Sequence, residues 1–136
     1  MKLQEKIISE FPKGEAPCQL INNEGYWKTY AKTWIDVEDE AISACPQSLI
    51  FLEWDECLYY LPRFMNWILD DIDGKINPKL RTCIYIFPWI IGNWQQLKDS
   101  MDNQKIKLIK DFLLACQKDP NYSLDLEMTG IDPKKI

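Results

Sequence analysis

The chain has 136 residues, which is the size of one domain, and its 46 % hydrophobic and 27 % charged residues exclude a disordered polypeptide. Five cysteines, an odd number without any C-x-x-C pair, argue against a disulfide framework. The net charge of −5 makes the protein acidic. With no signal peptide and no apolar run long enough to span a bilayer, we expect a cytoplasmic protein that does not enter the membrane.

The first third of the sequence predicts short helices separated by a loop. Apolar residues recur at helical spacing over 2–11, where Pro12 ends the pattern. Prolines, glycines and asparagines over 12–25 predict a loop. Aromatic residues at spacings of three and four predict a second helix over 26–34. Asp36 is expected to cap the next helix, which ends before Pro46.

The middle of the sequence predicts the most buried helix. Residues 48–52 form a short apolar run that fits either a buried strand or an extended entry to the next helix. That helix is expected to begin at Asp55. Pro62 either kinks it or starts a new helix at its first position. Residues 62–72 are apolar on most sides and are therefore expected near the centre of the fold.

The last third predicts one clear helix and a polar tail. Residues 83–91 are rich in isoleucine and aromatic residues, and we expect either a helix that ends before Pro88 or an irregular buried segment. An amphipathic helix is predicted over about 102–118. Residues from about 119 to 136 are polar and are predicted to lie on the surface. The prediction is one all-α domain over 1–136, with five or six helices around a single core and possibly one short extended segment.

No cluster of residues predicts a metal site, a cofactor site or a nucleophile. The chain contains no histidine, which excludes Cys–His and Ser–His–Asp arrangements and every zinc site with a histidine ligand. The cysteines lack the paired spacing of a Cys₄ zinc site. A calcium loop that places Gly74 at its sixth position fails, because Leu69 and Leu80 then occupy the positions of essential carboxylates. We therefore expect no metal, no cofactor and no enzymatic activity.

Two segments leave a functional alternative open beside the structural interpretation. Glu53, Asp55 and Glu56 could include a carboxylate pair for acid–base chemistry, but acids at the start of a helix are more often caps. The Tyr59–Met65 segment could line a ligand groove. It is more typical of the core, with Arg63 and the tyrosine hydroxyls reaching carboxylates.

Charge is unevenly distributed along the sequence. Residues 24–73 hold eleven acids and three bases, a net of −8, whereas residues 74–136 hold seven acids and ten bases, a net of +3. Clustered lysine and arginine, which nucleic-acid binding requires, are absent from the middle segment. An acidic surface suits a basic protein partner, while a surface that only keeps the chain soluble is the alternative. The predicted partner-binding residues are Asp36, Glu38, Asp39, Glu40, Glu53, Asp55, Glu56, Asp70, Asp71 and Asp73.

Several short motifs occur in an order that resembles a known family. They are Phe11-Pro12, then Trp34 with acids after it, Phe51-Leu52, the Tyr59–Met65 segment, and Gln104 with Phe112-Leu113. This order resembles an uncharacterised family of small bacterial domains that share a Trp, a Phe-Leu pair and a Tyr-Leu-Pro segment. The resemblance spans about residues 3–117 and implies no catalytic residues.

The general character of the chain is similar to that of immunity proteins from bacterial toxin systems, which are small, cytosolic and often acidic. This similarity implies a protein that neutralises a cognate toxin domain by masking its active site. Two other functions stay open: a small enzyme that uses carboxylate or tyrosine chemistry, and a structural or regulatory subunit of a larger assembly. A pocket with a buried acid of shifted pKa would favour the enzyme, and a large exposed apolar patch would favour the subunit.

Overall fold

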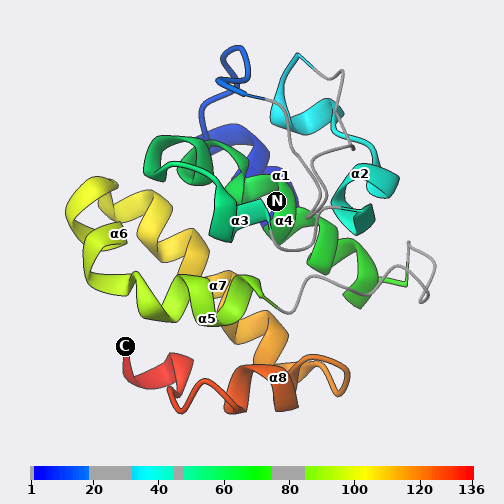
Figure 1. Cartoon of the computed structure of the whole chain (residues 1–136). Coiled ribbons are helices and arrows are strands. Elements are labelled where there is room, and N and C mark those ends of the chain that lie inside the picture. Colours follow the sequence, from blue (N-terminus) through cyan, green and yellow to red (C-terminus); the bar gives the residue numbers. More distant parts are fainter. Residues whose placement is uncertain (1, 19–31, 45–47, 75–84) are drawn as a thin grey trace.

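The computed structural model describes residues 2–18, 32–44, 48–74 and 85–136. Within them it forms α-helices and two 3₁₀-helices and no strand, so the all-α prediction is confirmed (Figure 1). Eight α-helices lie in these ranges, more than the five or six expected, because several are only one or two turns long. No helix in this part of the chain has the length and apolar character needed to cross a membrane.

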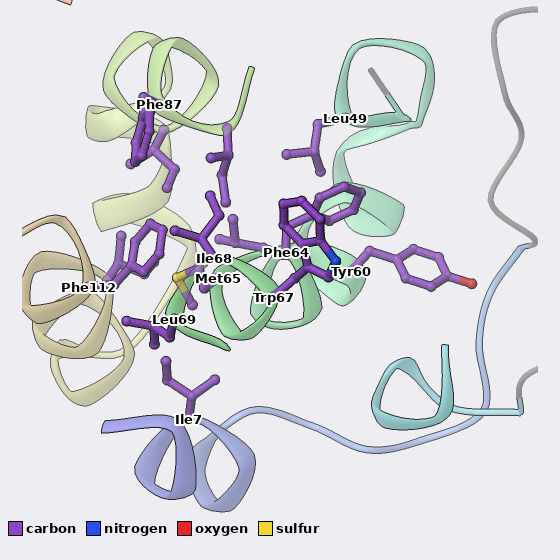
Figure 2. Close-up of a cluster of buried hydrophobic side chains, with 14 of the residues drawn as sticks. Ile7, Leu49, Tyr60, Phe64, Met65, Trp67, Ile68, Leu69, Phe87 and Phe112 are labelled. Atoms are coloured by element: carbon purple, nitrogen blue, oxygen red, sulfur yellow. The ribbon is translucent and has the colours of Figure 1, made fainter. Parts of the chain in front are cut away.

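The long helix α4 (Trp54–Ile72) lies at the centre of the fold. Every residue from Tyr60 to Leu69 in it is buried, so the helix needs cover on all sides. Helices α1 (Leu3–Glu10), α2 (Asp39–Ala44) and α7 (Asn103–Lys118) and the 3₁₀-helix η1 (Trp34–Asp36) contact it directly. Figure 2 shows Ile7, Leu49, Phe87 and Phe112 around the side chains of α4.

Several predicted boundaries are confirmed. Helix α1 covers the segment expected over 2–11, and α2 ends at Ala44, before Pro46. Helix α7 matches the helix predicted over about 102–118, and the Asp102 carboxylate caps it by accepting from the Lys105 backbone N–H at 3.0 Å. Of the helix predicted over 26–34, residues 26–31 lie outside the described residues.

The prediction for residues 48–52 is wrong, since Ser48–Phe51 forms the short helix α3. Within this apolar run only Leu49 faces the core, whereas Ile50 and Phe51 are exposed. The Cys57 thiol donates to the Leu49 carbonyl, with 3.2 Å between sulfur and oxygen, and so ties α3 to α4. A four-residue helix is too short to show the periodicity that separates helix from strand.

The two prolines in predicted helices have different outcomes. Pro62 lies inside α4, so of its two alternatives the new helix starting at residue 62 is excluded. The prediction for Pro88 is wrong. Helix α5 (Ile86–Gly92) begins just before Pro88 instead of ending there. Pro88 is the third residue of α5, where a backbone N–H has no partner within the helix, and its missing N–H is therefore tolerated. Residues 83 and 84 of that predicted segment lie outside the described residues.

Asp36 does not cap the following helix. It is the last residue of η1, and its carboxylate accepts from the Thr33 hydroxyl at 3.2 Å. Helix α2 begins only at Asp39. The preference of aspartate for N-caps indicated a helix start in this region but placed it two residues too early.

The chain after residue 119 is more than a polar surface tail, because it contributes Tyr122, Leu126 and Pro133 to the buried residues. It forms helix α8 (Ser123–Glu127) and the 3₁₀-helix η3 (Pro133–Lys135), which both pack on α7, while α6 (Trp94–Ser100) joins α5 to α7 (Figure 1). Tyr122 and Leu126 are 3 % and 1 % exposed, and the Tyr122 hydroxyl donates to the buried Asp71 carboxylate. Two buried side chains only one turn apart in a polar sequence gave too weak a pattern to predict this packing.

We predict that truncating Leu126 to alanine lowers the free energy of unfolding by about 2 to 5 kcal/mol, because it empties a buried site. Leu124→Ala is the matched control, since Leu124 lies on the same helix and is 63 % exposed; it should change stability by less than about 0.5 kcal/mol. Urea unfolding of both variants measures the difference. Equal effects would contradict the packing of α8 into the core.

Candidate functional site

A buried arginine holds the predicted acidic segment against α4. Arg63 is only 8 % exposed, and its Nε donates to the Val37 carbonyl at 2.9 Å. Its Nη2 lies 2.7 Å from the Asp39 carboxylate, which is the carboxylate contact predicted for Arg63. The tyrosine hydroxyls were also predicted to reach carboxylates, but Tyr59 and Tyr60 donate to backbone carbonyls instead. Arg63 thus fixes both the backbone and one side chain of the link between η1 and α2.

Trp34 fixes the other end of the same segment. Its indole is 1 % exposed, and its Nε1 donates to the Pro12 carbonyl at 2.8 Å. Its backbone N–H donates to the Tyr59 hydroxyl at 3.0 Å, and that hydroxyl donates to the Gly14 carbonyl at 2.6 Å. The segment from Trp34 to Asp39 is therefore attached to α4 by hydrogen bonds at both ends.

The attached segment and the start of α2 carry three exposed acids, Asp36, Glu38 and Glu40, which we name the acidic edge. Asp39 lies among them but is half-buried and turned toward Arg63. Since the segment is held at Trp34 and at Val37, the backbone that carries these carboxylates is fixed before any partner arrives. A rigid arrangement of charge costs less conformational entropy on binding than a flexible one.

The other predicted partner-binding acids lie elsewhere. Glu53, Asp55 and Glu56 are at the start of α4, and Asp70, Asp71 and Asp73 are at its end. At 1.5 Å per residue, Asp55 and Asp73 are separated by about 27 Å along the helix. The ten acids therefore do not form one patch. Glu53, Asp55 and Asp73 are exposed as well, but the acidic edge places three exposed acids within five residues.

Some of these acids serve the fold. Asp71 is 4 % exposed and accepts from the Tyr122 hydroxyl, so it is corrected from partner-binding to structural. Asp70 accepts from the Gln4 side-chain amide at 2.7 Å. Glu56 accepts from the Glu53 backbone N–H at 2.9 Å and closes the first turn of α4. Asp39, as described, is bound to Arg63.

The Tyr59–Met65 segment belongs mainly to the core, as its structural interpretation predicted, but one face of it lines a cleft. The cleft has a volume of about 330 Å³ and lies between the end of α1, the first half of α4 and the α6–α7 junction. Its walls combine apolar and polar side chains, and Asp55, Tyr59, Ser100, Asp102 and Lys105 supply its polar groups.

The polar groups of this cleft are poorly suited to acid–base chemistry near neutral pH. The Lys105 side chain beside Asp102 lowers the pKa of that carboxyl, which therefore stays ionised. Burial raises the pKa of the Tyr59 hydroxyl, which is already bound to Trp34 and Gly14. General acid–base catalysis instead requires a pKa near the operating pH. The cleft thus gives no specific support to carboxylate or tyrosine chemistry.

Two cysteines near the start of α4 are held as protonated thiols. Burial, together with a hydrogen bond to the Glu56 carboxylate, raises the pKa of Cys18 to about 12. Burial and the charges of Glu56 and Glu53 raise the pKa of Cys57 to about 11. The thiolate is the nucleophilic form, so both groups are unreactive at neutral pH. Among the residues that the structure describes, no group of three or more His, Cys, Asp or Glu could hold a metal ion.

Exposed apolar side chains lie mainly on two short helices. Ile50 and Phe51 on α3 are 59 % and 62 % exposed, and Leu124 and Met128 at α8 are 63 % and 78 % exposed. Both helices pack on α5, which therefore lies between them. Among the residues that the structure describes, these side chains lie in two separate places, one on each helix.

No family model, no curated protein and no solved structure matches the chain. The resemblance to the family of small bacterial domains and the similarity to immunity proteins stay predictions.

One residue of this region was missed by sequence reasoning. Asn66 follows Arg63 by one helical turn, and Asp70 follows Asn66 by another, so the three lie on one face of α4. A polar stripe at i, i+3 and i+7 inside an otherwise apolar helix is visible in the sequence. It indicates a polar contact inside the fold, and the structure places α1 and η1 against this face.

We predict that Arg63→Met lowers the free energy of unfolding by about 2 to 4 kcal/mol. The substitution keeps the length of the side chain but leaves the Asp39 carboxylate and the Val37 carbonyl without their donor. Lys107→Met is the matched control, because it breaks an exposed ion pair with Asp111, which is expected to contribute less than about 1 kcal/mol. Equal losses in denaturant unfolding would show that Arg63 does not hold the segment.

We predict that alkylation of Cys18 by iodoacetamide keeps accelerating by about tenfold per pH unit up to about pH 10, whereas an ordinary thiol levels off near pH 8.5. The reason is its pKa of about 12. Glu56→Gln should lower that pKa only part of the way, since burial is the largest cause and remains. Peptide-resolved mass spectrometry measures the rate, and a plateau below pH 9 in the native protein would contradict the burial of this thiol.

Proposed function

We propose that the chain is an immunity-type binding protein whose acidic edge binds a basic protein partner and masks its active site. The observation that carries the proposal is the attachment of the edge. Buried Arg63 and Trp34 hold Asp36, Glu38 and Glu40 on a fixed backbone while their carboxylates remain exposed. A partner with a basic cleft, such as a toxin domain that acts on nucleic acid, offers the complementary charge.

The electrostatics of the edge support fast association. Lys32 is the only base among residues 32–44, and the charge of Arg63 is balanced by Asp39. Residues 85–136 hold seven acids and seven bases, so the negative charge of the described chain lies in residues 32–44 and 48–74. Exposed charges at the rim of an interface mainly raise the association rate and do so most at low ionic strength.

The test compares two triple neutralisations. Asp36→Asn, Glu38→Gln and Glu40→Gln together remove the charge of the edge. Glu10→Gln, Asp99→Asn and Glu127→Gln remove three exposed acids from other helices and serve as the matched control. The partner is captured from the native host, identified, purified and then measured against each variant by surface plasmon resonance at two salt concentrations.

We expect the edge variant to associate about 10- to 100-fold more slowly at low salt, with the control variant within about twofold of the unmodified chain. The activity of the purified partner should fall to background at one equivalent of the chain. A partner that binds the edge variant as fast as the unmodified chain would place the interface elsewhere. A partner that stays active in the saturated complex would contradict masking.

A further inference from the structure

The cleft of about 330 Å³ at the start of α4 adjoins the segment that carries the acidic edge. Two of its lining residues, Pro12 and Tyr59, are the hydrogen-bond partners of Trp34, which precedes Asp36 by two residues. Its volume is at the lower end of the range for ligand pockets, about 300 to 1,000 Å³, and therefore suits a single side chain. The cleft is thus placed to add a buried contact to the interface of the edge.

Apolar side chains from three parts of the fold line this cleft. Phe11 follows α1, Leu58 and Pro62 lie on α4, and Met101 joins α6 to α7. Leu58 and Met101 are half-buried, so part of their surface is open to a ligand. The long stems of lysine and arginine pack against such side chains while the charged end reaches a polar group.

One carboxylate of the cleft has no partner. Among the described residues that line the cleft, Lys105 is the one cation, and its ammonium group is bound to the Asp102 carboxylate. Asp55 is exposed, also lines the cleft, and forms no hydrogen bond or ion pair with any residue that the structure describes. The lining therefore carries one net negative charge, and the carboxylate that supplies it is accessible.

The segments that form the cleft are acidic as well. Residues 10–15, 53–62 and 98–105 together hold seven acids and three bases. An acid in the first turn, such as Asp55, also stabilises α4 through the helix dipole, but this role leaves its carboxylate accessible. The charge and the apolar walls together favour a cation with an apolar stem over an anion or a neutral group.

We propose that this cleft receives one lysine or arginine side chain of the basic partner, with its stem against Leu58 and Met101 and its charged end at Asp55. The inference rests on the proposed function, since it names a buried contact of the same interface. The two surfaces differ in what they do. The edge speeds the encounter with the partner, whereas a side chain held in the cleft slows dissociation.

Small probes test the cleft without the partner. N-acetyl-lysine methylamide and N-acetyl-arginine methylamide carry the proposed side chains, N-acetyl-norleucine methylamide carries an uncharged stem, and N-acetyl-glutamate methylamide carries the opposite charge. The reporter is the methyl group of Met101, which lines the cleft, in ¹H–¹³C spectra of the full chain labelled at its methionine methyl groups. Met128 is exposed on α8, does not line the cleft, and reports nonspecific binding.

We expect saturable shifts of the Met101 methyl signal with the two cationic probes, at dissociation constants on the order of millimolar, while the Met128 signal stays unchanged. The norleucine probe should bind at least about fivefold more weakly, because it leaves the Asp55 carboxylate without a partner. Equal binding of the norleucine probe, preferential binding of the glutamate probe, or equal shifts at Met128 would overturn the proposal.

Two variants locate the binding site. Asp55→Asn removes the charge of the carboxylate and should weaken the cationic probes by about fivefold or more. Ser100→Trp places a large side chain at an exposed position that lines the cleft, so it should obstruct binding. Both positions are exposed, and both variants should therefore stay folded. Glu127→Gln removes an exposed acid of α8 as the matched control and should leave binding within about twofold. Undiminished binding to either cleft variant would overturn the proposal.

The captured partner separates this proposal from the preceding one. At the higher salt concentration, Asp55→Asn and Ser100→Trp should each raise the dissociation rate of the complex by about fivefold or more. The triple neutralisation of the acidic edge should instead lower the association rate, and it should leave probe binding within about twofold because its acids do not line the cleft. If the probes bind but both cleft variants dissociate at the unmodified rate, the cleft is a site for a free small cation; its assignment to the interface is then overturned and the edge proposal stands. Unchanged association of the edge variant, with faster dissociation of the cleft variants, would overturn the edge alone.

Discussion

The fold depends on burying α4 on every side. A helix with ten consecutive buried residues cannot be covered by one partner helix, so α1, α7, α2 and η1 surround it, and the short helices fill the remaining space. Long helices alone would leave gaps around such an axis. The need for cover explains why the chain uses many one- and two-turn helices, and why α8 contributes Tyr122 and Leu126 to the core.

Complete burial also explains the polar contacts. Arg63 and Asn66 lie in the buried part of α4, where an unpaired charge would be costly. The chain satisfies Arg63 with the Val37 carbonyl and the Asp39 carboxylate, and this requirement brings the segment with the acidic edge against the helix. The position of the edge is therefore a consequence of the core, and it is as rigid as the core contacts that hold it.

The sequence predicted what depends on long-range periodicity and missed what depends on packing. Helices α1 and α7 were predicted because each shows an apolar face over two or more turns and a clear end. Helix α3 was missed because four residues carry no periodicity, and α5 because Pro88 was interpreted as an end when it occupies the first turn. The predicted acids were identified by charge alone, and charge cannot distinguish exposed Glu38 from buried Asp71, whose partner Tyr122 lies 51 residues away.

The role of the acidic edge follows from how charge acts in water. Three exposed carboxylates are screened by salt within about 8 to 10 Å, so they accelerate encounter but add little to the lifetime of a complex. A protein that masks a toxin must stay bound, and long residence comes from a few well-buried contacts. The exposed acids of this chain supply none of these. Buried contacts beyond the edge must therefore supply the lifetime of the complex, while the edge supplies the rate at which it forms.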